Sequence, residues 1–215
     1  MIFSDRADAG RQLAESLSGY SGSKDVVVLG IPRGGVVVAY EVARRLEAPL
    51  DLFLSAKLPV PGQEELAFGA MVEDGTCFLN DDIILAARVS EEEIEQTKAV
   101  VAQRLRARAL LYRTTRQALN VECKSVILVD DGIATGASMQ VSILALRSMR
   151  TARLAIGVPV APASTCRRLT PLVDELVCLI QPRDFSAVSQ FYREFLQTSD
   201  EEVAELLRRG AQTSP

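Results

Sequence analysis

The chain has 215 residues, of which 48% are hydrophobic and 24% are charged. These proportions are typical of globular proteins, so we expect one folded domain, or one domain with a small appendage, and not a disordered or fibrous chain. The 24 Lys and Arg residues against 28 Asp and Glu residues give a net charge of -4. This balance argues against a general nucleic-acid-binding surface, so any phosphate site must be local.

Histidine is absent from the sequence, and cysteine occurs only four times. The lack of histidine excludes Ser–His and Cys–His nucleophiles and most transition-metal sites, whereas a hard cation bound through oxygen stays possible. Cys77, Cys123, Cys166 and Cys178 form no Cys-x-x-Cys pair, so we interpret them as inert thiols. No apolar run approaches the roughly 20 residues of a membrane span, and residues 1–6 do not resemble a secretory signal, so we expect a cytoplasmic protein.

The pattern of apolar residues predicts strands that alternate with helices. Two of the strands, 25–30 and 125–129, contain the uninterrupted apolar runs 26–29 and 126–129, which indicates burial on both faces, as in a parallel sheet. Each leads through a short loop with glycine into a helix, an order typical of α/β folds with right-handed crossovers. Ser90 and Glu93 have the spacing of a capping box at the start of a long helix. In chain order we predict helix 5–17, strand 25–30, helix 36–46, strand 50–55, helix 90–118, strand 125–129, a helix ending near 148, strands 154–158 and 175–180, and a last helix after 199.

The residues after strand 125–129, which we call the aspartate loop (130–138), carry the chemistry. Asp130 and Asp131 end the strand and so lie at the carboxyl edge of the sheet, where open α/β folds bind ligands. The small residues that follow run into a helix and offer backbone amides and the positive end of its dipole to an anion. They are Gly132, Ile133, Ala134, Thr135, Gly136, Ala137 and Ser138. The arrangement fits a phosphorylated polyol, with its hydroxyls on the carboxylates and its phosphate in the loop.

An ordinary turn with a helix cap would use the same residue types, but we favour a phosphate site because acids, glycines and hydroxyls all fall where it needs them. The segment resembles the phosphoribosyl pyrophosphate (PRPP) signature of type I phosphoribosyltransferases. The resemblance implies that Asp130 and Asp131 hold the ribose hydroxyls, directly or through a metal, and that 133–138 cradle the 5′-phosphate. It covers most of the chain and implies a doubly wound, mainly parallel five-stranded α/β sheet with a small hood.

A second part of the predicted site is the arginine turn (residues 30–35), which follows strand 25–30. A parallel sheet would bring this turn beside the aspartate loop, although glycine turns of this kind open many βα units. By the same resemblance it is the pyrophosphate loop, with Arg33 and the amides of Gly34 and Gly35 as ligands of the leaving group. The planar guanidinium of arginine can bind two phosphate oxygens at once.

Segment 56–70, rich in proline and glycine, is predicted as a loop after a strand that ends near Lys57. It resembles the mobile catalytic loop of the family, in which many relatives carry Arg-Lys where this chain has Ala56 and Lys57. The resemblance therefore transfers a catalytic role only to Lys57, beside Arg33, Asp130 and Asp131. An ordered surface loop with a solvated lysine is the alternative.

The C-terminal part resembles the hood of an uncharacterised bacterial and archaeal branch of this family. We expect residues 1–180 to form the PRPP-binding core, and residues 181–215 to add the hood and the last helix within the same domain. Phe185 or Tyr192 could stack on a flat acceptor, but aromatic residues at this spacing more often form a small core.

The resemblance implies that a nitrogenous, nucleobase-like acceptor displaces pyrophosphate from PRPP. Mg²⁺ is the implied cofactor, held by Asp130 and Asp131 indirectly through ribose hydroxyls or water. Relatives that act on 6-oxopurines usually carry an acid at the position of Ala134, so hypoxanthine and guanine are disfavoured, and adenine, orotate, uracil or another acceptor stays open. A PRPP-sensing regulator without turnover is the alternative function. The resemblance also implies a homodimer, while nucleic acid and membrane are not expected as partners.

Overall fold

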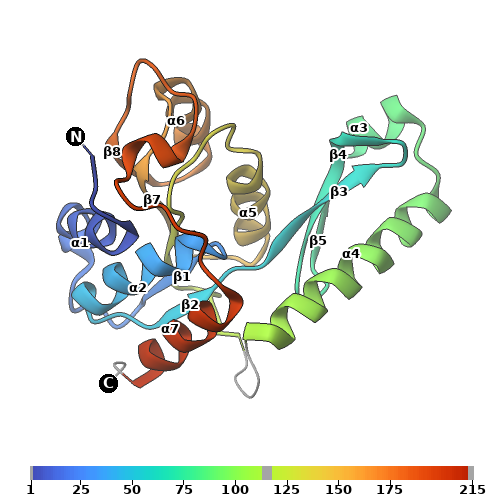
Figure 1. Cartoon of the computed structure of the whole chain (residues 1–215). Coiled ribbons are helices and arrows are strands. Elements are labelled where there is room, and N and C mark those ends of the chain that lie inside the picture. Colours follow the sequence, from blue (N-terminus) through green and yellow to red (C-terminus); the bar gives the residue numbers. More distant parts are fainter. Residues whose placement is uncertain (1, 113–117, 213–215) are drawn as a thin grey trace.

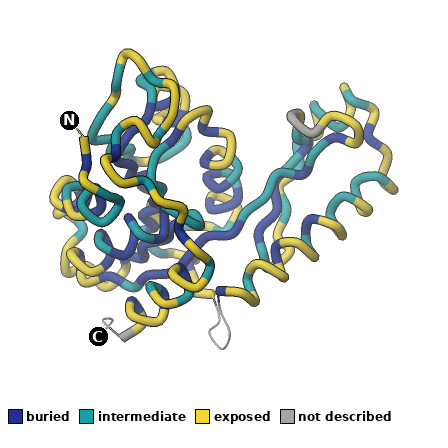
Figure 2. The backbone as a smooth tube through the Cα atoms, in the orientation of Figure 1, coloured by how far each residue is buried: buried dark blue, intermediate teal, exposed yellow. Residues whose placement is uncertain are grey.

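The computed structural model describes residues 2–112 and 118–212, and its larger sheet has five strands, all parallel (Figure 1). The strand order is β2-β1-β6-β7-β8. The strands are β1 (Val26–Gly30), β2 (Leu50–Leu52), β6 (Ser125–Val129), β7 (Arg153–Val160) and β8 (Glu175–Ile180). The predicted parallel five-stranded α/β sheet is therefore confirmed. Figure 2 shows β1, β2, β6 and β7 as mainly buried, dark blue segments, whereas the edge strand β8 is of intermediate burial.

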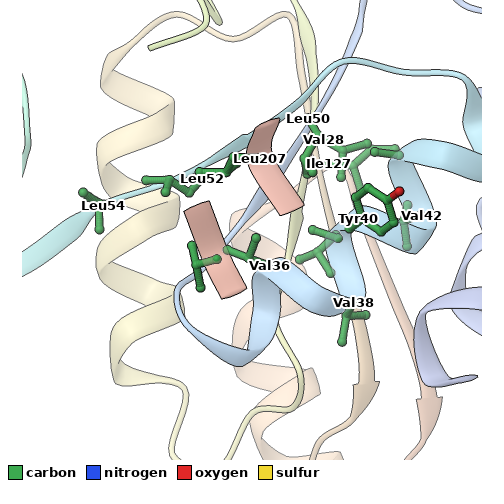
Figure 3. Close-up of a cluster of buried hydrophobic side chains, with 14 of the residues drawn as sticks. Val28, Val36, Val38, Tyr40, Val42, Leu50, Leu52, Leu54, Ile127 and Leu207 are labelled. Carbon is green, nitrogen blue, oxygen red and sulfur yellow. The ribbon is translucent and has the colours of Figure 1, made fainter. Parts of the chain in front are cut away.

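Helices cover both faces of this sheet because successive side chains of a strand point to opposite sides. Val28 and Ile127 pack with Val36 and Leu207 in one buried cluster, part of which is drawn in Figure 3. Leu128, one residue further along β6, belongs to the cluster on the other face. The first face is covered by α1 (Arg6–Ser16), α2 (Gly34–Leu46) and α7 (Asp200–Gln212), and the second by α5 (Ala137–Ser148) and α6 (Ala163–Leu169).

A second, antiparallel sheet forms an arm that extends to one side of the main sheet (Figure 1). Its strands are β3 (Ser55–Val60), β4 (Gln63–Val72) and β5 (Cys77–Leu79), followed by α3 (Asp81–Ala87) and α4 (Glu91–Tyr112). The prediction of a loop over 56–70 was wrong, since these residues form the hairpin β3–β4. Gly62, with φ of 75°, makes the tight turn, and Pro59 lies at a register shift, where its missing N–H is tolerated.

The helix ends follow the capping signals of the sequence. Ser90 Oγ accepts a bond of 3.3 Å from the Glu93 amide, and Glu93 Oε2 accepts one of 2.9 Å from the Ser90 amide, which confirms the predicted capping box. The helix predicted to reach 118 is α4, and residues 113–117 of that prediction lie outside the described ranges. None of the described helices combines the length and apolar character that crossing a membrane requires.

Candidate functional site

The arginine turn and the aspartate loop leave the main sheet side by side. Strands β1 and β6 are neighbours in parallel register, with Gly30 opposite Val129 at their carboxyl ends. The register continues into the turn, because the Ile31 amide donates a 2.9 Å hydrogen bond to the Val129 carbonyl. The two segments to which the resemblance gave the diphosphate and the ribose phosphate thus start from adjacent positions at one sheet edge.

Two glycines of the arginine turn pack directly against the two aspartates. A Cβ atom on Gly34 would overlap Asp131 Oδ2, and one on Gly35 would lie 2.8 Å from Asp130 Oδ1. Only a residue without a side chain fits here while the carboxylates keep their positions. The structure therefore brings Gly34, Gly35, Asp130 and Asp131 together.

The two aspartates are adjacent carboxylates in a mostly buried position. Asp130 Oδ1 accepts a 2.9 Å hydrogen bond from the Asp131 amide. Burial raises the pKa of Asp130 well above its ordinary value, and the neighbouring charge of Asp131 adds to this effect. Burial also raises the pKa of Asp131, and Arg6 opposes that shift. Keeping both carboxylates charged therefore lowers the stability of the folded protein. A cation, or a hydrogen-bond donor from a ligand, would offset this loss of stability.

Arg6, which the sequence analysis missed, holds Asp131 from the start of α1. Its Nε donates a 2.6 Å hydrogen bond to Asp131 Oδ2, and its side chain is only 12% exposed. Its Nη1 donates a 2.6 Å bond to the Leu196 carbonyl, and its guanidinium lies 3.8 Å from the centre of the Phe195 ring. The sequence held one weak signal: a cation at the first position of a helix is disfavoured by the helix dipole and needs a local partner.

Two side chains of α6 donate hydrogen bonds to backbone carbonyls of the aspartate loop. Thr165 Oγ1 donates a 2.9 Å hydrogen bond to the Ala134 carbonyl, and the Arg168 guanidinium donates to the Thr135 carbonyl. Gly136, with φ of 77°, turns the chain into α5, whose first residues are Ala137 and Ser138. These bonds fix the loop backbone, while the side chains of Thr135 and Ser138 stay exposed at the helix N-terminus, where an anion is favoured.

Arg33 and Lys57 reach this region from different elements. Arg33 precedes α2, and its guanidinium forms no hydrogen bond or ion pair with any residue of the described ranges. Lys57 lies on β3 opposite Ala70 and lines, with Ala137 and Ser138, a groove of about 390 Å³ between α5 and the hairpin. The structure thus brings Lys57 to the end of the aspartate loop, in a groove whose lining does not include Arg33 or the aspartates.

Tyr192 belongs to a small aromatic core beneath the hood segment (residues 181–199). It is buried, and its ring centre lies 5.4 Å from that of Phe3 and 4.9 Å from that of Phe195. Its hydroxyl donates a 2.5 Å hydrogen bond to the Asp131 carbonyl, so it supports the aspartate loop. Phe185 stacks on Phe191 at 5.8 Å in the same cluster. The interpretation of these aromatic residues as a small core is confirmed.

Comparison with known proteins gives the family. The family profile described as "Phosphoribosyl transferase domain" matches residues 3–195. The chain belongs to this family. Two proteins of Mycobacterium tuberculosis, from strains CDC 1551 and H37Rv, are named provisionally as phosphoribosyl transferases and are 44% identical to it over 209 residues. The match covers 97% of this chain and 47% of each relative, so this phosphoribosyl transferase domain spans about half of their length.

A solved crystal structure also resembles this phosphoribosyl transferase domain. It is that of protein TT1426 from Thermus thermophilus, which is 40% identical, with a TM-score of 0.88. The alignment covers 97% of this chain and 99% of that protein, so the main sheet and the arm described above have a close counterpart in a solved structure.

Proposed function

We propose that this domain transfers the 5-phosphoribosyl group of PRPP to a nitrogenous, nucleobase-like acceptor and releases pyrophosphate. The observation that carries the proposal is the contact between Gly34 and Asp131, which joins the arginine turn to the aspartate loop at one sheet edge. PRPP carries a diphosphate and a 5′-phosphate on one ribose, so it needs two anion sites separated by a site for hydroxyls. Membership of the phosphoribosyl transferase family supports the same reaction class.

The aspartate loop would bind the ribose 5-phosphate part of PRPP. Asp130 and Asp131 would accept hydrogen bonds from the ribose hydroxyls, which would offset the cost of holding two carboxylates in a buried place. The 5′-phosphate would lie at the N-terminus of α5, on the backbone amides of the loop and the hydroxyls of Thr135 and Ser138. The residues proposed to contact it are Gly132, Ile133, Ala134, Thr135, Gly136, Ala137 and Ser138.

The arginine turn would bind the leaving diphosphate. Arg33 and the amides of Gly34 and Gly35 would take up the charge that develops on pyrophosphate as the glycosidic bond breaks. Lys57 would add a cation from the groove beside Ser138. Catalysis would then consist of positioning and charge stabilisation, with no covalent intermediate on the protein.

The site fits a magnesium ion only in company with the substrate. Within the described ranges, no group of three His, Cys, Asp or Glu residues could hold a metal ion alone. Mg²⁺ is commonly bound by one or two carboxylates together with substrate phosphates, and Asp130 and Asp131 would supply such a pair through ribose hydroxyls or water. When bound with PRPP, the ion would neutralise charge on the diphosphate.

The acceptor would bind on the hood side of the aspartate loop. Ala134 is exposed and has no group that exchanges a proton with a purine ring, so we propose an acceptor other than hypoxanthine or guanine. In this proposal residues 1–180 form the PRPP-binding core, residues 181–215 add the hood and α7, and the working form is a homodimer. The hood segment already touches the loop through Val188, because a Cβ on Gly132 would lie 2.5 Å from Val188 Cγ1.

Release of pyrophosphate tests the proposal. The protein is incubated with PRPP, Mg²⁺ and, in turn, adenine, orotate, uracil and other bases, with D131N as the control. We expect pyrophosphate and a nucleotide with at least one base and little of either with D131N. Saturable PRPP binding without turnover on any base would favour a PRPP-sensing regulator, and no binding of PRPP would overturn both functions.

A further inference from the structure

The side chain of Arg6 lies where the two halves of the proposed PRPP site meet. Its Nε is 2.6 Å from Asp131 Oδ2, and a Cβ on Gly34 would lie 2.6 Å from the same Nε. The guanidinium thus contacts the carboxylate proposed for the ribose and adjoins the glycine proposed for the diphosphate. Arg6 is separated from Asp131 by 125 positions in the sequence, so the fold has to bring the start of α1 to this sheet edge.

The guanidinium is held in one orientation by three different contacts. Phe195 lies against its face at 3.8 Å, the Leu196 carbonyl accepts from Nη1, and Asp131 accepts from Nε. A planar group fixed on a ring and at two edges has little freedom left, so it also fixes the carboxylate that it binds. The Asp131 oxygen that accepts this hydrogen bond from Arg6 is Oδ2.

A purely structural role for Arg6 would be to connect the N-terminal residues to the hood. Backbone hydrogen bonds already connect them, because the Phe3 amide donates to the Phe191 carbonyl at 2.8 Å and the Arg193 amide donates to the Phe3 carbonyl at 2.9 Å. The Glu194 amide donates to the Ser4 carbonyl at 3.0 Å in the same place. The Arg6 side chain adds its contacts with Leu196 and Phe195 to these backbone bonds. Its bond to Asp131 connects the same region to the aspartate loop, which the three backbone bonds do not reach.

We propose that Arg6 is a positioning residue for PRPP: it holds the Asp131 carboxylate in the orientation that receives the ribose hydroxyls beside the diphosphate turn. This inference rests on the proposed function. It assigns the start of α1, which the aspartate and arginine motifs do not include, to the PRPP site. The guanidinium contacts Asp131 directly, and its positive charge lowers the pKa of Asp131, and to a smaller extent that of Asp130, against the effect of burial.

The test is the affinity for PRPP, measured by calorimetry in the presence of Mg²⁺. We expect R6Q to weaken binding roughly tenfold to a hundredfold, the range for losing a hydrogen bond between charged groups. R6K keeps the charge without the planar fork, so it should recover part of the affinity. The matched control is R11Q: Arg11 lies on the same helix, is 52% exposed and only approaches Asp8 at 3.8 Å, so PRPP affinity should not change.

A double-mutant cycle with D131N shows whether Arg6 acts through Asp131. We expect R6Q to weaken PRPP binding in the wild-type background and to add little in the D131N background. Unchanged affinity of R6Q, or equal losses in both backgrounds, would overturn the inference while the proposed function stands. Should R6Q fold poorly, R6K is compared in the same two backgrounds with the same criterion. If the wild-type protein binds no PRPP, the proposed function fails and this inference fails with it.

Discussion

Gly34 lies so close to Asp131 that a methyl group on its Cα would overlap the carboxylate oxygen Oδ2. This contact joins the turn after β1 to the loop after β6, two segments almost 100 residues apart that meet because their strands are neighbours. It makes position 34 sensitive for a reason that has nothing to do with backbone conformation, because Gly34 has no left-handed φ and begins an α-helix.

The variant G34A should therefore lose PRPP affinity without losing its fold. Alanine is the better helix former by up to about 1 kcal/mol, which partly offsets an overpacking cost of about 1–3 kcal/mol. We expect a net loss in unfolding free energy of no more than about 3 kcal/mol, and PRPP binding at least tenfold weaker because Asp131 and Arg6 must move. The measurements are denaturant unfolding and calorimetry. Control G19A has open space around its Cβ and should bind PRPP normally, and wild-type affinity in G34A would refute this role of the contact.

Asp130 should make the protein less stable as the pH rises. Burial raises its folded-state pKa above the unfolded value of about 4, so the folded protein binds this proton more tightly than the unfolded chain does. The stability gained from that proton is present below about pH 4 and is lost as the pH rises through the folded-state pKa. D130N keeps an oxygen for the Asp131 amide and removes the charge, so it should be more stable than the wild type at pH 7.5.

The measurement is urea unfolding of D130N and wild type at pH 4 and at pH 7.5. We expect the gap between the two proteins to be small at pH 4 and larger at pH 7.5, with PRPP binding weakened in D130N. This is the pattern of a carboxylate kept for binding at a cost in stability. A gap that is equal at both pH values, or a D130N that is less stable at pH 7.5, would contradict a buried and costly Asp130.

Thr165 should affect the phosphate affinity although it lies on α6, outside the aspartate loop. The variant T165V keeps the shape of a buried side chain and removes the donor to the Ala134 carbonyl. We expect a loss of about 1–2 kcal/mol in stability and a severalfold loss in affinity for ribose 5-phosphate, since the loop backbone is less well held. The matched control is T170V, because Thr170 Oγ1 donates to the Cys166 carbonyl away from the loop. Ribose 5-phosphate affinity that is equal in T165V and wild type would show that α6 does not order the loop.

The sequence predicted the main sheet because β1 and β6 carry uninterrupted apolar runs, the first ending in glycine and the second followed by two acids. It also predicted that the aspartate loop and the arginine turn would adjoin, because parallel strands end at the same edge of a sheet. The structure adds that β1 and β6 are direct neighbours in this sheet. It missed the hairpin β3–β4, because Pro59 and Gly62 are typical of loops and only the register shift of the folded sheet accommodates the proline.

The supporting residues of the site could not be predicted in the same way. Arg6, Thr165 and Tyr192 reach the aspartate loop through contacts that span from 31 to 125 positions in the chain. Such contacts depend on where helices and the hood pack on the sheet, and one local pattern carries no information on that placement. Local motifs therefore predicted the residues that we propose to contact the ligand, and the fold was needed to find the residues that position them.

Arg33 should be important for turnover and unimportant for binding the sugar phosphate. Its guanidinium has no hydrogen bond or ion pair among the described residues, so R33A leaves no partner unsatisfied, and its stability should stay within about 0.5 kcal/mol of the wild type. If Arg33 stabilises the departing pyrophosphate, kcat should fall by about a hundredfold, while ribose 5-phosphate, which has no diphosphate, should bind as before. Steady-state kinetics and calorimetry with ribose 5-phosphate give the two numbers. The control R44A removes an exposed arginine of α2, the helix that follows Arg33. Arg44 pairs with Glu41 at 2.7 Å, and its loss should change neither number. An equal loss of turnover and of ribose 5-phosphate affinity in R33A would instead place Arg33 on the sugar phosphate, because a group that binds only the leaving diphosphate cannot affect a ligand without one.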